Sequence, residues 1–244
     1  NIKMKLVKYL ADCEVAARRK CAELIKSGIV SVNNKTIKNP LFEIDAENDI
    51  IKVEGKIIKK SKKNIQKLYI LFYKPEKCIT SVSDDKGRTT VMDYLQKIRG
   101  WKTLYPVGRL DYDTEGLLIL TNDGDYAQKI QHPSNKIIKT YLAKVKGIPT
   151  PKELEKLTKN IKVDGEFVRC ISAKLVEKLK ANSWIELKII SGQNRIIRKL
   201  CDYINHSVIK LIRTGIGGFN LKDIPLTKGG YIIMNNIQKD YVFK

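Results

Sequence analysis

The sequence predicts an α+β protein with two domains: two helices plus a small sheet come first, followed by a mixed, mostly antiparallel sheet with flanking helices. Three observations predict this. Helical apolar spacing dominates the start of the chain, whereas later segments alternate as strands do. The later strands lack the regular strand–helix–strand rhythm of a parallel α/β fold. Finally, the charged segment KKSKKN (59–64) separates the two patterns. We therefore expect a first domain over 1–60, a linker over 61–66 and a second domain over 67–244.

The first domain is predicted from two helical patterns and two turns. MKLVKYLADC and VAARRKCAELIKSG carry apolar residues at helical spacing: Leu6, Leu10, Cys13, Ala17, Cys21, Leu24 and Ile25. Gly28 can end the second helix. Beyond it, IVSVNNKTI alternates around Asn33 and Asn34, and DIIKVEGKII alternates around Glu54 and Gly55. Each segment predicts a β-hairpin.

The second domain is predicted from strands and two helices. The apolar run LYILFYKP (68–75) ends at Pro75 and predicts a buried strand. GLLILTNDGDYAQKIQHP (116–133) predicts a strand leading into a short helix, with Thr121, Asn122 or Asp123 able to cap it. KTYLAKVKG (139–147) and NSWIELKIISG (182–192) alternate as strands. NRIIRKLCDYIN (194–205) has one apolar helical face.

Composition narrows the class of protein. The net charge is +21, from 47 Lys and Arg against 26 Asp and Glu, which predicts a polyanionic partner, with nucleic acid first. The alternative is a lysine-rich surface that only confers solubility. The five cysteines are scattered and only two histidines exist, so neither a disulfide framework nor a zinc site is expected. No apolar run approaches the roughly 20 residues of a membrane span. We expect a soluble protein in a reducing compartment.

The stretch VGRLDYDTEGLLIL (107–120) places Asp111, Asp113 and Glu115 at alternate positions. A calcium loop starting at Asp111 would need a bidentate Glu at its twelfth position, where this chain has Asn122. An aspartyl-phosphate enzyme would need a phosphate cradle, which GIGGF (215–219) imitates only weakly. The remaining alternatives are a polar turn and a reactive carboxylate on an irregular, rigidly flanked bend.

Four segments together resemble one known family. GRLDYDTEGLLILTNDG resembles the signature motif of the RsuA/RluB-type pseudouridine synthases. KTY (139–141) resembles their second motif, and GQNRIIRKL (192–200) followed by VIKLIRTGIGGFNL (208–221) resembles their third. Residues 4–40 are similar to the S-four-type RNA-binding domain that precedes the catalytic domain in most members.

The resemblance implies the reaction and its residues. Members isomerise uridine in RNA: the N-glycosidic bond breaks, the base turns, and its C5 joins the same sugar carbon. Their essential aspartate corresponds to Asp111, which could capture the sugar carbon or remove a proton from C2′. Their active-site tyrosine corresponds to Tyr141, implied to stack on the base or assist proton removal from C5; otherwise Tyr141 is a core aromatic. The third-motif basic residue corresponds to Arg198, expected to pair with Asp111 or, alternatively, with Asp202.

The resemblance also implies partners. The basic residues expected to contact RNA are Arg18, Arg19, Lys20, Arg109, Lys199 and Arg213, whereas Asp113 and Glu115 are assigned to structure. We expect ribosomal RNA or a ribosome assembly intermediate as the partner, with no metal, no cofactor and no membrane. NR in the third motif resembles the large-subunit (23S) branch; a small-subunit (16S) enzyme or a non-catalytic assembly factor are the alternatives. A monomer is expected, in the cytoplasm or an organelle of bacterial descent.

Overall fold

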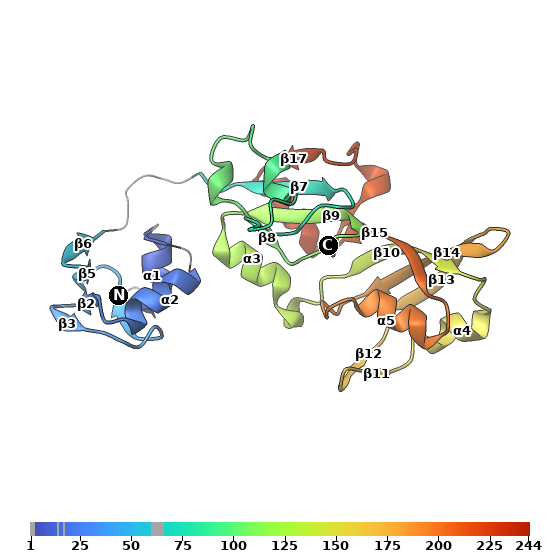
Figure 1. Cartoon of the computed structure of the whole chain (residues 1–244), viewed down its shortest axis with the longest axis horizontal. Helices are drawn as coiled ribbons and strands as arrows, with labels where there is room; N and C mark the ends of the chain where they lie inside the picture. The colour runs from blue at the N-terminus through green and yellow to red at the C-terminus, as the bar shows by residue number, and fades with distance from the viewer. Residues whose placement is uncertain (1–2, 14, 17, 60–65) are drawn as a thin grey trace. The chain divides into compact units, whose positions relative to one another are not determined.

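The computed structural model describes residues 3–13, 15–16, 18–59 and 66–244. The chain divides into two compact units, Asn1–Gln66 and Lys67–Lys244 (Figure 1). The segment predicted as a linker, 61–66, lies outside the described residues except for Gln66. The predicted α+β class is confirmed, because both units combine short helices with β-sheet.

The described residues of the first unit form two helices, a two-stranded sheet and a four-stranded sheet. Its elements are β1 (Lys3–Lys5), α1 (Leu6–Asp12), α2 (Arg18–Lys26), β2 (Val30–Val32), β3 (Lys35–Thr36), β4 (Glu43–Asp45), β5 (Ile51–Val53) and β6 (Lys56–Ile58). The strand order is β3-β2-β5-β6, and β1 pairs with β4. The pairing of β1 with β4 joins segments far apart in the chain, and neither strand was predicted.

Both predicted hairpins of this unit are confirmed. Asn33 and Asn34 link β2 to β3, and Glu54 and Gly55 link β5 to β6. All four have positive φ, from 49° to 78°, which a two-residue turn of this hand requires and which Asn and Gly adopt at low cost. The predicted helical faces meet in the core, where Leu6, Leu10, Cys21 and Ile25 are fully buried.

The second unit is built on one mixed, mostly antiparallel sheet, as predicted. Its order is β13-β14-β10-β15-β9-β7-β17, with β16 added to β15 and β8 added to β9. The strands are β7 (Tyr69–Lys74), β8 (Tyr105–Val107), β9 (Thr114–Thr121), β10 (Lys139–Lys146), β13 (Ser172–Lys178), β14 (Asn182–Ile189), β15 (Val208–Ile216), β16 (Phe219–Asn220) and β17 (Tyr231–Ile233). A separate hairpin joins β11 (Ile161–Val163) and β12 (Glu166–Val168).

The helices of this unit are short and flank the sheet. They are α3 (Gly124–Gln131), α4 (Pro151–Lys156), α5 (Ile196–Tyr203) and α6 (Asn236–Lys239), with 3₁₀ turns at Val91–Tyr94, Trp101–Thr103, Pro133–Asn135, Leu221–Asp223 and Asp240–Phe243. In Figure 1, α3 lies beside β8 and β9, and α4 lies near β13. Among the three predicted caps of α3 the structure selects Asp123, whose side chain accepts hydrogen bonds from the backbone N–H groups of Asp125 and Tyr126.

The middle of the sheet contains its one parallel contact between the described strands. Residues Leu211–Arg213 of β15 pair with Thr114–Gly116 of β9 over three positions. Gly116 has a φ of +119°, and a Cβ placed there would lie 2.2 Å from the backbone oxygen of Arg213. The two strands can therefore approach this closely only because residue 116 is glycine.

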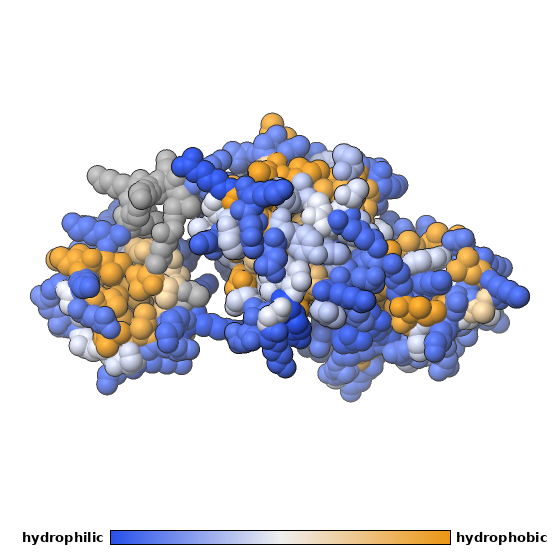
Figure 2. Space-filling view, turned by 45° about the horizontal axis from the view of Figure 1, so that its top comes forward, coloured by the Kyte–Doolittle hydropathy of each residue, from blue (hydrophilic) through white to orange (hydrophobic). Residues whose placement is uncertain are grey.

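The face of the molecule drawn in Figure 2 is largely hydrophilic. Figure 2 shows polar residues over much of the face in view, with smaller apolar patches between them. Among the described residues, no helix combines the length and the apolar character needed to cross a bilayer.

Candidate active site

The loop that carries Asp111 runs from the end of β8 to the start of β9. It leaves β8 through Gly108, which has a φ of +79°, and turns back where the backbone N–H of Thr114 donates to the carbonyl of Asp111 at 3.1 Å. The sequence prediction of an irregular bend at this point is confirmed.

Alternate residues of this loop are tied to the segment 74–80. Leu110 exchanges two hydrogen bonds with the Thr80 hydroxyl, at 2.8 and 3.2 Å. The carbonyl of Tyr112 accepts from the backbone N–H of Lys77 at 2.7 Å, and the carbonyl of Thr114 accepts from Lys74 Nζ at 2.8 Å. The backbone on both sides of Asp111 is therefore fixed, which holds its carboxylate in place.

Asp111 pairs with a different arginine from the one expected. Its Oδ2 lies 3.5 Å from Arg195 Nη1, whereas Arg198 pairs with Asp113 at 2.8 Å. The expectation that Arg198 binds Asp111 is therefore wrong for this structure, and the alternative partner, Asp202, does not receive it either. Arg198 also donates to the carbonyl of Val208 at 3.3 Å, which draws its side chain toward β15.

Arg195 was missed by sequence reasoning. It precedes the first residue of α5 in a left-handed conformation, with a φ of +52°. Helical spacing could not reveal which of two arginines three residues apart would face Asp111, because that depends on where the helix begins. Its side chain is about half exposed, so this long ion pair contributes little to stability.

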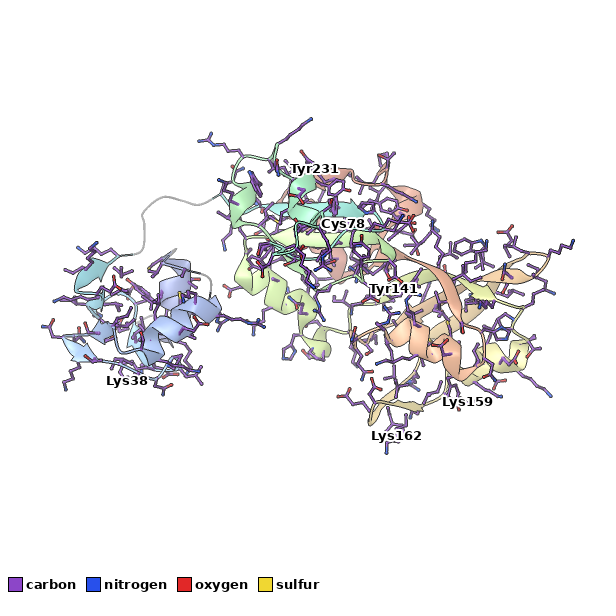
Figure 3. The ribbon with its side chains drawn as sticks, viewed as in Figure 1. Lys38, Cys78, Tyr141, Lys159, Lys162 and Tyr231 are labelled. Atoms are coloured by element: carbon purple, nitrogen blue, oxygen red, sulfur yellow. The ribbon has the colours of Figure 1, made fainter. Side chains whose placement is uncertain are left out.

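Tyr141 lies in the interior of the same site. It is on β10, opposite Arg213 of β15 and Leu187 of β14, and is 9% exposed. Figure 3 labels it near the middle of the second unit, between β15 and α5. Tyr141 and Asp111 line one cavity of about 870 Å³, and so do Arg109, Lys139, Arg195 and Arg213. A cavity of this size can admit a nucleotide.

Five of the six residues predicted to contact RNA lie in three different settings. Arg109 lines the cavity and is exposed. Lys199 is outside the cavity lining and forms an ion pair with Asp164. Arg18, Arg19 and Lys20 are exposed at the start of α2 in the first unit, where Lys20 pairs with Glu23 at 3.0 Å.

Arg213 differs most from its predicted setting. It was expected to meet phosphates, but it is 4% exposed, and its Nε donates to the carbonyl of Leu117 at 2.8 Å. The close approach of β9 to β15 at Gly116 covers it, and this long-range contact leaves no pattern in the local sequence.

Glu115 has the structural role expected for it. Its carboxylate is fully buried and receives Lys210 at 2.6 Å and Lys228 at 2.8 Å. Burial alone would raise the pKa of Glu115, but the hydrogen bonds from these two lysines outweigh it and hold that pKa below its ordinary value. Glu115 therefore remains a carboxylate that links β9 to β15 and does not serve as an acid.

Lys74 lies beneath the Asp111 loop. It is 0% exposed, and its ammonium donates to the carbonyls of Pro75 and Thr114 at 2.9 and 2.8 Å. Burial lowers the pKa of Lys74 to about 8, partly opposed by nearby groups that include Asp113 and Asp111. The one sequence feature that indicates a buried lysine is its position at the end of an otherwise apolar and aromatic strand.

The depressed pKa of Lys74 makes a testable contribution to stability. Since the folded protein releases this proton at about pH 8 and the unfolded chain does so near 10.4, the unfolded state binds more protons between these values. The free energy of unfolding is thus expected to gain a rising component between about pH 8 and 10. Lys74→Met should flatten this rise in denaturant titrations, whereas Met at the exposed neighbour Lys77 should keep it. If the free energy of unfolding rose equally with pH in the wild type and in both variants, Lys74 would not be the group responsible.

The described residues offer few other reactive groups. No cluster of three or more His, Cys, Asp or Glu side chains among them has the arrangement of a metal site. Cys13, Cys21, Cys78, Cys170 and Cys201, all of them described residues, carry thiols that are not joined in disulfides. Burial raises the pKa of Cys78 to about 11 and that of Cys170 to about 12, so neither is a ready nucleophile.

Comparison with known proteins assigns both units. The family model for RNA pseudouridylate synthases matches residues 68–203, and that for the S4 domain matches residues 4–51. The ribosomal large subunit pseudouridine synthase B of Bacillus subtilis is 42% identical over 90% of this chain and 88% of its own length. An uncharacterized RNA pseudouridine synthase of Aquifex aeolicus is 32% identical over 100% and 95%. A crystal structure of a pseudouridylate synthase shares the fold, with a TM-score of 0.67 at 24% identity over 98% of this chain and 99% of the other.

Proposed function

Because this chain belongs to the RNA pseudouridylate synthase family, we propose that it converts a specific uridine of large-subunit (23S) ribosomal RNA to pseudouridine, with Asp111 as the essential carboxylate. The observation that carries the proposal is the meeting of Asp111 and Tyr141, from separate loop and strand, at one cavity. Both residues come from the motifs that identify the family. The large-subunit assignment is supported by the Bacillus subtilis relative, whose name specifies that subunit.

Asp111 has the chemistry that the first step needs. Breaking the bond between the sugar C1′ and N1 of uracil leaves positive charge on the sugar, which a carboxylate can stabilise or capture. The fixed backbone at Leu110, Tyr112 and Thr114 holds that carboxylate without reorganisation. Removal of a proton from C2′ by Asp111 is the other route, and the same geometry would serve it.

Tyr141 and the arginines have supporting roles. The phenol ring of Tyr141 faces the cavity and can stack on the uracil that has turned out of the RNA. Arg195 orients Asp111 directly, and Arg198 acts on the loop through Asp113. Arg109 and Lys199 are proposed to contact phosphates. The net charge of +21 supplies the general attraction to RNA.

The first unit is proposed to bind the RNA and position the enzyme on it. Its S4 match and the exposed Arg18, Arg19 and Lys20 support this role. Phosphate contacts of this kind place an enzyme without choosing the uridine. The partner is ribosomal RNA or an assembly intermediate, bound by a monomer in the cytoplasm or an organelle of bacterial descent.

Deleting residues 1–60 tests that division of labour. The truncated protein is expected to bind ribosomal RNA at least about tenfold more weakly, because it loses several phosphate contacts, and to keep the fold of the second unit. Filter binding at several salt concentrations measures the first effect and circular dichroism the second. Undiminished affinity would show that the first unit does not bind the RNA. As a matched control, Arg18, Arg19 and Lys20 are replaced together by Gln in the full chain.

The activity itself is tested by tritium release from RNA labelled with [5-³H]uridine. The hydrogen at C5 must leave when the carbon–carbon bond forms, so release reports the isomerisation directly. Large-subunit and small-subunit ribosomal RNA are assayed separately, each as naked RNA and as assembly particles. Release from large-subunit substrates alone is expected. Release only from small-subunit substrates would overturn the subunit assignment, and none from any substrate would favour the non-catalytic assembly factor.

A further inference from the structure

Two basic side chains lie inside the cavity on the strands that surround Tyr141. Lys139 is two residues before Tyr141 on β10, so both side chains lie on the same face of the sheet. Arg213 is directly opposite Tyr141 on β15. All three residues line the cavity, and the two cations therefore flank the aromatic ring.

Neither cation has a counter-ion among the described residues. The ammonium of Lys139 donates to the carbonyl of Ile190 at 2.9 Å. In Arg213 the Nε group donates to Leu117, but the buried Nη2 has no hydrogen-bond partner among the described residues. The two described carboxylates that line the cavity are engaged elsewhere, Asp111 with Arg195 and Glu166 with Gln193.

The proximity of these two cations is energetically unfavourable. Burial, with a further contribution from the charge of Arg213, lowers the pKa of Lys139 to about 8. A cation that is withdrawn from water with no carboxylate beside it is unfavourable, even when it donates one hydrogen bond to a backbone carbonyl as these two do. Two such groups side by side point to an anionic or strongly hydrogen-bond-accepting ligand that compensates them when it is bound.

The depth of the pair identifies which part of the RNA that ligand is. Arg213 is 4% exposed, whereas Arg109 of the same cavity lining is exposed and so within reach of the phosphate backbone of a bound strand. A base turned out of its stack is the part that enters a closed pocket and lies against an aromatic ring. The carbonyl oxygens at the edge of a uracil stacked on Tyr141 can then meet the flanking cations.

We infer that Lys139 and Arg213 hold the carbonyl oxygens of the target uracil and stabilise the negative charge that forms on the ring when the glycosidic bond breaks. In that step the electron pair of the C1′–N1 bond remains on the base, where N1, O2 and O4 share it. Asp111 accounts for the positive charge left at C1′. When C5 bonds to C1′, the ring returns that electron pair to the new carbon–carbon bond, and where Asp111 has captured C1′ its bond to that carbon breaks and frees the carboxylate. The C5 proton then leaves and N1 takes up a proton from solvent.

The pair thus matches the transition state better than the substrate. Neutral uracil offers only dipolar acceptors, but the departing base carries a full charge beside a buried guanidinium and a half-buried ammonium. Fixed donors at such positions act without reorganisation, and loss of one typically lowers kcat by about 10²–10³-fold. This inference rests on the proposed function, since it assigns residues to the same reaction.

The test compares the rate of the chemical step with the affinity of the enzyme for RNA. The full-length enzyme, Arg213→Gln, Lys139→Met and Lys139→Arg are assayed for single-turnover tritium release at saturating RNA and for Kd at several salt concentrations. Arg99→Gln and Lys97→Met each remove one exposed charge outside the cavity and serve as matched controls. We expect Arg213→Gln and Lys139→Met to lower the rate constant by about 10²-fold or more, with Kd changed by no more than a few-fold. Lys139→Arg, which keeps the charge, should retain more of the rate than Lys139→Met.

Other results separate the competing explanations. If the two residues bound phosphates, Kd would rise, the slope of log Kd against log salt would fall by about 0.7 per lost contact, and the saturated rate would be unchanged. That outcome, or a wild-type rate in both variants, overturns the inference. If Arg213→Gln does not fold, Lys139→Met and its Arg counterpart decide the question. An inactive wild type would refute the proposed function instead, so the two failures are distinct.

Discussion

Asp111→Asn is expected to lower tritium release by about 10⁴-fold or more while leaving the affinity for RNA within a few-fold. Asn has the shape of Asp but neither its charge nor its ability to capture the sugar carbon, and loss of a residue essential to a covalent step has effects of this size. The fold should be unaffected, because the ion pair with Arg195 is long and partly exposed. Single-turnover release and filter binding, carried out on the same RNA, measure the two quantities.

Asp113→Asn is the matched control, two residues along the same loop. Its side chain is 55% exposed and faces Arg198, and its carboxylate is assigned to the structure of the loop. We expect this variant to keep its turnover within about tenfold of wild type, because Asp113 is on the exposed side of the pair and Arg198 keeps its hydrogen bond to the carbonyl of Val208. If the Asp111 variant retained turnover, Asp111 would have no place in the mechanism. Equal losses in the two variants would instead indicate that the loop needs both charges to keep its shape.

Gly116→Ala is expected to have the largest effect on stability. The added Cβ would lie 2.2 Å from the oxygen and 2.6 Å from the nitrogen of the Arg213 backbone, neither of which can move without separating β9 from β15. The φ of +119° adds backbone strain. We expect the free energy of unfolding to fall by about 4 kcal/mol, from overpacking and strain together. Denaturant titration measures the fall.

Gly87→Ala separates strain from the clash. Gly87 also has a positive φ, +68°, but a Cβ there meets nothing within 4 Å. Replacing Gly87 with Ala should therefore lower the free energy of unfolding only through backbone strain, by about 1 kcal/mol. If the two variants lost the same stability, the close contact of β9 with β15 would not be what excludes a side chain at position 116.

The local sequence pattern predicted those helices, strands and turns that are determined by their own residues. The apolar faces of α2 and α5, the alternation in β10 and β14, and the turn residues of both hairpins of the first unit all act over a few neighbouring positions. Local sequence carries such information because side-chain period and turn geometry are properties of short segments. The signature around Asp111 was recognised for the same reason: its residues are contiguous.

Long-range contacts account for what the sequence did not reveal. The partner of Asp111 depends on the residue at which α5 begins, and the burial of Arg213 depends on a parallel strand nearly 100 residues away. Lys74 and Thr80, which hold the Asp111 loop, lie 40 and 30 residues before the loop residues that they bind. Their individual identities carry no periodic signal. The motifs thus pointed to several residues that line the cavity, but they did not reveal the interactions that those residues make.

The short parallel contact at Gly116 also divides the catalytic groups. Asp111 belongs to the β8–β9 side of the sheet, while Tyr141, Arg195 and Arg213 belong to the β10–β15 side. Only three residue pairs join β9 to β15, against eight between β10 and β14. Asp111 and Tyr141 thus reach the cavity from two parts of the sheet that meet at this line, where the ion pair of Lys210 with Glu115 adds a second connection. A substitution that deforms the sheet at Gly116 would therefore be expected to change the distance between the carboxylate and the tyrosine, and with it the width of the cavity.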